Sequence, residues 1–150
     1  MLSVTTLRAD DIDRVDAALP LNRLDTHLET DSTYLIAWKD DEPVGHAHVA
    51  WSATTLGLPE IQDVFVLPPH RRHGVATALT EAAEAEARAR GTETMSLSVS
   101  LDGNPPARRL YESLGYRDAG IQPARVSGVI QLRGKPFEVD DTLLYLVKPL

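Results

Sequence analysis

The segment 66–76 holds residue types that bind a phosphate group. Its sequence is Val-Leu-Pro-Pro-His-Arg-Arg-His-Gly-Val-Ala, and it joins a run of β-forming residues to an alanine-rich stretch. The first N–H groups of a helix have no acceptor within the helix, and the helix dipole makes that end positive. Gly74 lets the backbone approach an anion closely, and Ala76 leaves room for it. Arg71 and Arg72 add positive charge, so the segment predicts a phosphate site, with a basic loop that binds nothing as the alternative.

Two other kinds of phosphate loop are excluded. A P-loop needs Gly-Lys-Ser or Gly-Lys-Thr at the start of the helix, and neither occurs here. A dinucleotide-binding fingerprint needs three glycines, whereas Gly74 is the only glycine in this segment. The segment therefore belongs to neither class.

Two carboxylates on one predicted strand are candidates for acid–base chemistry. Glu60 and Asp63 fall in the segment 60–66, which is rich in Val, Ile and Phe. Because side chains alternate along a strand, we expect Glu60 to point to the same face as Val66 and Asp63 to point to the opposite face. The two carboxylates should therefore not share a site. A solvated carboxylate at the end of a strand is the alternative for each of them.

A pair of histidines lies on another predicted strand. His46 and His48 are two residues apart within 44–51 and should share a face. No third ligand is indicated and the chain has no cysteine, so we expect no metal site. A surface or partly buried pair is the simpler interpretation. A base or a substrate contact is the functional alternative for one of them.

The elements that must position these residues follow from hydrophobic periodicity and from Gly and Pro positions. Strands are expected over 3–7, 34–39, 44–51, 60–66, 94–99 and 142–148, with a further strand beginning at Tyr116. Helices are expected from Asp10 or Asp11 to Leu19, more weakly over 21–31, and over 74–90 and 106–114. The acidic turn Asp40-Asp41-Glu42 joins two strands into a hairpin, and the segment 120–136 has no clear pattern.

Composition is that of one folded domain over residues 1–150. The chain is 43% hydrophobic and 25% charged, and it has no cysteine, which excludes disulfide scaffolds, thiolate-zinc sites and cysteine nucleophiles. No apolar run approaches the ~20 residues of a membrane span. The first residues lack a basic stretch followed by an apolar one, so we expect no secretory signal and a cytoplasmic protein.

The net charge of −7 is unevenly distributed. Residues 1–42 hold ten acidic and four basic residues and so carry −6 of it. An acidic chain without a basic stripe is not expected to bind nucleic acid. The acidic third is either a solvated surface or a rim that attracts cationic substrates.

Two motifs resemble those of one enzyme family. Arg71-x-x-Gly74-x-Ala76 resembles the acyl-CoA pyrophosphate loop of the GNAT N-acetyltransferase superfamily. The segment 104–116 resembles the next helix of that family at its Asn, Ala, Leu-Tyr and Gly-Tyr positions (Asn104, Ala107, Leu110, Tyr111, Gly115 and Tyr116). The resemblance is strong over 60–116 and weak in the first 30 residues and over 120–141.

The resemblance implies a fold and a mode of cofactor binding. The fold would be α/β (α+β): a mixed central sheet of six to seven strands, flanked by about four helices, with a splayed gap between strands 4 and 5. Acetyl-CoA would lie in that gap, between 60–66 and 94–99, and the side chain of Asn104 would contact the pantetheine arm. The backbone of Val64, Phe65 and Val66 would pair with pantetheine amides. The pyrophosphate would be held by the loop and the start of the helix (Arg71, Arg72, His73, Gly74, Val75, Ala76 and Thr77).

The resemblance also implies chemical roles. Tyr111 matches the family tyrosine near the thioester sulfur and would be the general acid, with a core aromatic that bounds the cofactor slot as the alternative. A backbone N–H near Val66 would polarise the thioester carbonyl. Glu60 lies where some family members place a base that acts through water. Asp63, one of the two histidines, or water alone remain alternatives for the base.

The function implied is N-acetyl transfer from acetyl-CoA directly to a primary amine of a small molecule or a peptide. The absence of cysteine excludes an acyl-cysteine intermediate. A CoA-binding sensor without turnover, or an interaction domain whose loop binds nothing, are the competing interpretations. The resemblance also allows a homodimer. The segment 122–138 is expected to be a loop that covers the acceptor site, because long ordered loops are often functional.

Overall fold

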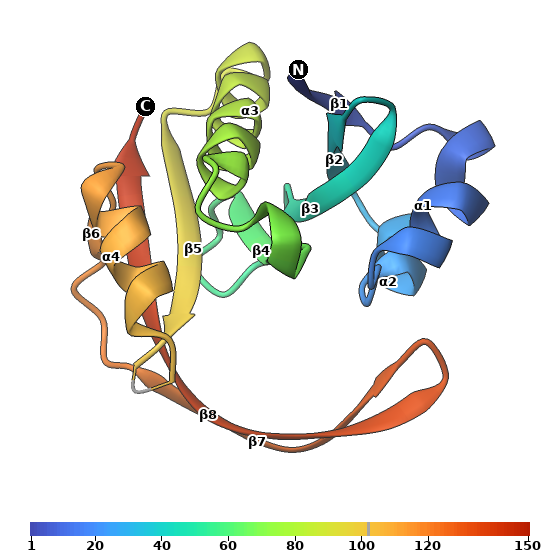
Figure 1. The fold of residues 1–150 in the computed structure, drawn as a ribbon. Coiled ribbons are helices and arrows are strands. Elements are labelled where there is room, and N and C mark those ends of the chain that lie inside the picture. The colour runs from blue at the N-terminus through green and yellow to red at the C-terminus, as the bar shows by residue number, and fades with distance from the viewer. Residues whose placement is uncertain (102) are drawn as a thin grey trace.

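The computed structural model describes residues 1–101 and 103–150 as one curved sheet with helices on both faces (Figure 1). Bonded strands follow the path β1–β2–β3–β4–β5–β8–β6, and β7 pairs with β8 beside this path. The strands are β1 Leu2–Thr6, β2 Ser32–Lys39, β3 Glu42–Ala50, β4 Glu60–Val66, β5 Thr94–Ser100, β6 Arg117–Asp118, β7 Ala124–Leu132 and β8 Lys135–Pro149. The α-helices are α1 Ile12–Ala18, α2 Leu24–Glu29, α3 Val75–Ala89 and α4 Pro105–Ser113, with 3-10 turns at Ala9–Asp11 and Pro68–His70.

This architecture confirms the predicted α/β (α+β) class. The main path has seven strands, within the predicted six to seven, and four α-helices lie in the described part of the chain. The hairpin of β2 and β3 is also confirmed, and its turn residues Asp40 and Asp41 have φ angles of 51° and 67°. The first predicted helix begins as expected after Asp11, which occupies the N-cap position of α1 without a side-chain capping bond, and Asp10 lies in the 3-10 turn before it.

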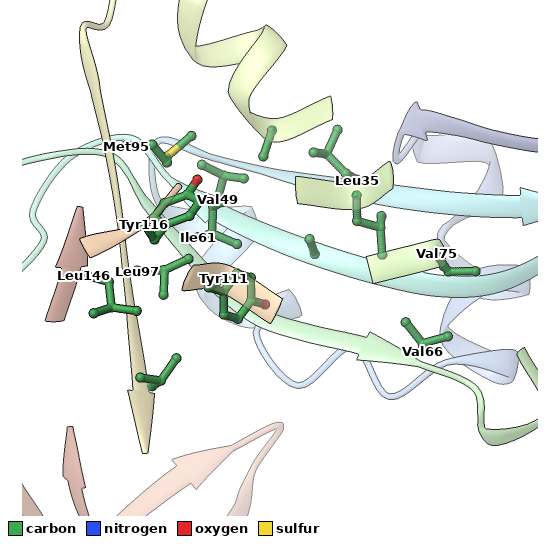
Figure 2. Close-up of a cluster of buried hydrophobic side chains, with 14 of the residues drawn as sticks. Leu35, Val49, Ile61, Val66, Val75, Met95, Leu97, Tyr111, Tyr116 and Leu146 are labelled. Atoms are coloured by element: carbon green, nitrogen blue, oxygen red, sulfur yellow. The ribbon is translucent and has the colours of Figure 1, made fainter. Parts of the chain in front are cut away.

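Alternation along the strands builds a separate core on each face of the sheet. On β2, Leu35 and Ala37 belong to the cluster beneath α3, whereas Tyr34 and Ile36 belong to a second cluster with residues of α1 and α2. Side chains of a strand point to opposite faces in turn, so one strand serves both cores. Figure 2 shows the first cluster, including Leu35, between the strands and α3.

Helix α3 is held by a stripe of small and aliphatic residues. Val75, Leu79, Ala83 and Ala87 recur every four residues and are all buried against the sheet. Gly91 follows the helix with a φ of 79°, a left-handed conformation that glycine commonly adopts directly after a helix. The packed face fixes the direction of α3, and with it the position of the helix N-terminus.

Strands β4 and β5 are parallel but separate after only two residue pairs. They pair only at Glu60 with Ser96 and at Ile61 with Leu97, while β5 continues in antiparallel pairing with β8. The first residues of β4 are fixed by Ser96, whose backbone N–H and hydroxyl both donate to the carbonyl of Pro59, at 2.9 and 2.8 Å. The rest of β4 therefore presents an unpaired backbone edge toward β5, which is the predicted splayed gap.

A bulge in β4 overturns one prediction. Between His46 and His48 the pairing of β3 with β4 shifts by one residue, and Asp63 has a left-handed φ of 53°. Such a bulge adds one residue and reverses the alternation beyond it. The prediction that Glu60 points to the face of Val66 is therefore wrong. Val66 packs in the core beneath α3, as does Ile61, the neighbour of Glu60.

The segment 120–141 is not a loop, as the sequence suggested for 122–138, but most of a long hairpin. Strand β7 pairs with the first half of β8, from Ala124 opposite Leu143 to Leu132 opposite Lys135. The turn residues Arg133 and Gly134 have φ angles of 55° and 74°, as in a two-residue hairpin turn. Figure 1 shows the hairpin extending away from the sheet toward α1 and α2.

Candidate active site

A cavity of about 680 Å³, here called the large cavity, lies along the open edge of β4. Its walls come from three places: the end of β4, the segment from the 3-10 turn to the start of α3, and one face of α4. These walls include all but one of the residues that the sequence assigned to acyl-CoA (Val64, Phe65, Val66, Arg71, Arg72, Gly74, Val75, Ala76, Thr77, Asn104 and Tyr111). His73 is exposed and does not line the cavity.

The loop before α3 has the conformation of an anion-binding turn. Arg72 and Gly74 both have left-handed φ angles, of 63° and 81°, which turns successive N–H groups toward one side. A Cβ added at Gly74 would have no heavy atom within 4 Å, so the space beside it is open. The first intrahelical bond runs from the N–H of Ala78 to the carbonyl of Gly74 at 3.0 Å, which leaves the preceding N–H groups of α3 for a ligand.

The guanidinium of Arg71 is fixed rather than free. Its Nε donates to the carbonyl of Val66 at 2.9 Å, and its Cζ lies 5.7 Å from the ring centroid of Phe65. This bond closes the turn between the end of β4 and α3. Arg71 therefore shapes the loop and places a positive charge on the wall of the large cavity.

Helix α4 brings the second motif to the same cavity. The side chain of Asn104 accepts from the N–H of Ala107 at 3.3 Å and caps the helix, and both residues line the large cavity. Leu110 and Tyr111 follow on the same face, because residues three and four apart lie together on a helix. Ala107 and Leu110 are motif residues that the sequence did not assign to the site, although their helical spacing relative to Asn104 and Tyr111 indicates the shared face.

Tyr111 lies between the diverging strands β4 and β5 (Figure 2). The side chain is 8% exposed, and its ring centroid is 6.0 Å from that of Tyr116. Within the described residues its hydroxyl makes no hydrogen bond, whereas the hydroxyl of Tyr116 donates to Glu84 at 2.8 Å. Burial raises the pKa of Tyr111 to about 12, so its phenol keeps its proton at neutral pH.

A second cavity of about 230 Å³, here called the small cavity, adjoins the first. Tyr111, Asn104, Ala107 and Val64 line both. The other residues of the small cavity come mainly from β4 and β5, and one, Arg23, comes from the start of α2 (Arg23, Glu60, Ile61, Gln62, Asp63, Leu97, Ser98, Val99 and Ser100). The structure thus brings Glu60 and Asp63 to one cavity, which the simple alternation of side chains had excluded.

Glu60 is held by a chain of hydrogen bonds. Gln62 donates from Nε2 to Oε1 of Glu60 at 2.9 Å, and its own Oε1 accepts from Nδ1 of His48 at 3.0 Å. His48 is fully buried, and Glu60 is 8% exposed. Because Nδ1 of His48 donates to Gln62, Nε2 is the unprotonated nitrogen of the neutral ring. Within the described residues, Nε2 of His48 has no hydrogen-bond partner.

The histidines are buried and neutral, so neither is a surface residue. His46 lies against Phe65 at 5.8 Å between ring centroids and bonds through Nε2 to the carbonyl of Pro20 at 2.9 Å. Burial lowers the pKa of His46 and lowers that of His48 to about 4. The carboxylate of Asp63 opposes the shift at His46, and Oδ2 of Asp63 is buried without a hydrogen-bond partner in the described structure.

Two further findings concern metal and membrane. Across residues 1–101 and 103–150, no group of three or more His, Asp or Glu side chains is arranged to hold a metal ion. None of the helices in these residues has the length and apolar character that a membrane crossing requires.

The arrangement of the sheet, the loop and α4 has counterparts among known proteins. The sequence model of the acetyltransferase (GNAT) family matches residues 4–116. Among curated protein sequences, none matches the chain. A GNAT family acetyltransferase from Elizabethkingia anophelis with acetyl-CoA bound has a TM-score of 0.71 at 16% identity, covering 99% of this chain and 98% of that one.

Two other solved structures are similar over nearly their full length. The ribosomal-protein-S18-alanine N-acetyltransferase from Escherichia coli has a TM-score of 0.71 at 20% identity, covering 99% of this chain and 94% of that one. Nourseothricin acetyltransferase has a TM-score of 0.71 at 22% identity, covering 99% and 98%. These likenesses concern the fold. The family model spans more than half of the chain, and on that ground the protein belongs to the acetyltransferase (GNAT) family of acyl-CoA-dependent enzymes.

Proposed function

We propose that this protein transfers an acetyl group from acetyl-CoA directly to a primary amine. The observation that carries the proposal is the meeting of the two cavities at Tyr111. The large cavity has an open strand edge and a free helix N-terminus, and the small cavity has the carboxylates of Glu60 and Asp63. A donor site and an acceptor site that share one proton-donating side chain suit a direct transfer.

The large cavity has the features that acyl-CoA needs. The unpaired backbone of β4 can pair with the amides of the pantetheine arm as another strand would. The N–H groups of Val75, Ala76 and Thr77, together with the turn at Gly74, can hold the pyrophosphate. The structure of the Elizabethkingia relative contains acetyl-CoA, which supports this choice of donor.

The acceptor must lose a proton before it can attack. An alkyl ammonium has a pKa of ~10, so it is mostly protonated at neutral pH. Glu60 is the proposed base, directly or through water, because Gln62 and His48 fix its orientation at the wall of the small cavity. Asp63 is the second candidate, since its buried Oδ2 has no partner in the described residues.

Tyr111 is proposed to be the general acid that protonates the leaving sulfur of CoA. When bound, acetyl-CoA supplies an acetyl group that is activated as a thioester. The hydroxyl of Tyr111 can donate a hydrogen bond to the departing sulfur and finally its proton. Since burial raises the pKa of Tyr111 to about 12, the phenol keeps this proton well above neutral pH.

The acceptor is proposed to be a small molecule or a peptide. One structural relative is named as a ribosomal-protein-S18-alanine N-acetyltransferase, and another as a nourseothricin acetyltransferase. The two acceptors differ widely on one fold, so the fold leaves the choice between them open.

The direct test is release of CoA thiol from acetyl-CoA with a panel of amines, together with the mass of the acetylated product. We expect acceptor-dependent thiol release and a product heavier by one acetyl group. If the protein binds acetyl-CoA but acetylates no amine, it is a sensor of the donor. If it does not bind acetyl-CoA at millimolar concentration, it is neither an acetyltransferase nor a CoA sensor.

Variants Glu60→Gln and Asp63→Asn identify the base. Loss of a general base lowers kcat/KM by about 10²-fold or more at neutral pH. The loss in Glu60→Gln should shrink as pH rises toward the pKa of the amine, because solution deprotonation replaces the base. A pH-independent loss would mean a structural role, and a larger pH-dependent loss in Asp63→Asn would transfer the role to Asp63.

A further inference from the structure

Arg23 is the one residue of the N-terminal third that lines the small cavity among the described residues. It directly precedes α2, and its backbone N–H donates to the hydroxyl of Tyr34 at 2.8 Å. Tyr34 is fully buried between the histidines and the α1–α2 segment. The main chain of Arg23 is therefore fixed, while its partly buried side chain forms part of the cavity wall.

In the described part of the chain, the guanidinium of Arg23 has no partner of opposite charge. Within the described residues, no carboxylate oxygen lies within 4 Å of it, as is also true of several exposed arginines outside the cavity, whereas Arg90, Arg108, Arg125 and Arg133 each have such a partner. Arg23 is also the only cationic side chain on the small-cavity wall in the described structure.

The carboxylates of the same cavity come from β4. Glu60 accepts a hydrogen bond from Gln62, but Oδ2 of Asp63 is buried with no hydrogen-bond partner in the described structure. Neither carboxylate pairs with Arg23 within 4 Å, although all three residues line one cavity of about 230 Å³. Unpaired charges of both signs in a partly desolvated space cost free energy unless a ligand satisfies them.

We propose that the acceptor is an amine that also carries a carboxylate, as in a free amino acid, with Arg23 binding that carboxylate. This rests on the proposed amine acetylation. The ammonium group faces Glu60 and Asp63, and the planar guanidinium binds the two carboxylate oxygens. The small volume of the cavity favours a compact acceptor, because pockets for drug-sized ligands begin at about 300 Å³.

The ten acidic residues of 1–42 are not the charges that line this cavity. None of them is among its wall residues in the described structure, and Asp16 and Asp25 lie instead beside Arg133. The cavity wall therefore does not contain the acidic rim that would select purely cationic amines. Its cation comes from the N-terminal third and its carboxylates from the central sheet.

The test compares amino acids with their carboxamides, for example L-alanine with L-alaninamide and L-phenylalanine with L-phenylalaninamide. The ratio of kcat/KM for acid over amide is measured for the wild type and for Arg23→Gln. Comparing one ratio between two proteins cancels the difference in intrinsic amine reactivity. We expect the ratio to fall by about 10- to 100-fold in Arg23→Gln, the usual effect of losing a charged hydrogen-bond pair, and by less in Arg23→Lys.

Arg8→Gln is the matched control, because Arg8 is exposed, lies in the same N-terminal third and does not line the small cavity. It should leave the ratio unchanged. Since Arg23 contributes its backbone to the bond with Tyr34, the Gln variant keeps that bond and should fold. A ratio within twofold of the wild type in Arg23→Gln, or an equal loss for both acceptors, would overturn the inference.

Failure of the inference and failure of the proposed function give different results. If other amines are acetylated and neither amino acid is, the carboxylate proposal is wrong while amine acetylation stands. If no amine of any kind is acetylated although acetyl-CoA binds, the proposed function fails and the inference falls with it.

Discussion

Arg133, at the turn of the β7–β8 hairpin, forms two hydrogen bonds to the carboxylate of Asp16 on α1, at 2.7 and 2.8 Å. The guanidinium also donates to the carbonyl of Leu21 at 3.2 Å and lies 3.8 Å from Asp25. These contacts join the tip of the hairpin to the segment that leads to Arg23. The pairing with Arg133 lowers the pKa of Asp16, so the carboxylate remains charged in mildly acidic solution.

The Arg133–Asp16 pair predicts a measurable coupling. In a double-mutant cycle of Arg133→Gln and Asp16→Asn, we expect a coupling free energy of about 1 kcal/mol, near the top of the range for partly exposed pairs because the contact is bidentate. Urea unfolding of the four proteins measures it. The Arg125–Asp140 pair of the same hairpin is the control. It has one hydrogen bond instead of two, and its side chains are 71% and 67% exposed, so its coupling free energy should be near zero. Equal couplings for the two pairs would contradict the reasoning.

Gly74 predicts a selective loss of CoA affinity. Gly74→Val places a side chain in the large cavity and forces a left-handed φ on a branched residue, at ~1–2 kcal/mol of stability. Gly91→Val is matched, because Gly91 has a φ of 79° at the other end of α3 and open space beside it. Both variants should lose similar stability, but only Gly74→Val should bind CoA at least about tenfold more weakly by calorimetry. Unchanged affinity in a folded Gly74→Val would show that the pyrophosphate lies elsewhere.

Tyr111 predicts a loss of turnover without a loss of donor binding. Tyr111→Phe keeps the ring that separates β4 from β5 and removes only the hydroxyl, so kcat should fall by about 10²-fold while CoA affinity stays. Tyr116→Phe is the control. It leaves Glu84 without one hydrogen bond and should cost about 1–3 kcal/mol of stability, with kcat kept. If the two variants have the same kcat, Tyr111 has no role in the chemistry.

His48 predicts a pH dependence of stability. Burial lowers its pKa to about 4 in the folded protein, against ~6.5 in the unfolded chain. Between these values the unfolded state binds the extra proton, so the free energy of unfolding falls as pH drops from 6.5 to 4, by about 3 kcal/mol in total. The contribution of neutral His48 to the free energy of unfolding is fully present above pH 6.5 and is lost as the pH falls toward 4.

Urea unfolding between pH 4 and 7.5 tests this prediction. His48→Gln should show a flatter dependence on pH than the wild type, whatever its absolute stability. His73→Gln, at an exposed position of the loop before α3, should keep the wild-type slope. A wild-type slope in His48→Gln would mean that other groups cause the acid sensitivity.

The parts of the fold that the sequence predicted depend on local patterns. Helix α3 has a four-residue period of small residues and a glycine at its end, and the β2–β3 hairpin has an acidic turn between two apolar runs. Strand β7 was missed because most of its residues are exposed, including Val129 and Ile130. A strand that buries neither face needs no alternation of polar and apolar residues, and its pairing with β8 is decided by main-chain hydrogen bonds and the turn at Gly134.

The candidate site divides in the same way. The sequence by itself determined the loop that contains Gly74 and the helix that carries Tyr111, because each is a contiguous motif whose spacing sets its geometry. Only the tertiary structure decided which carboxylates meet Tyr111, since the bulge at Asp63 arises from pairing with β3 and reverses the side-chain alternation that the sequence implies. The place of Arg23 beside them was likewise decided by the packing of α2 and Tyr34, contacts between segments that no local pattern connects.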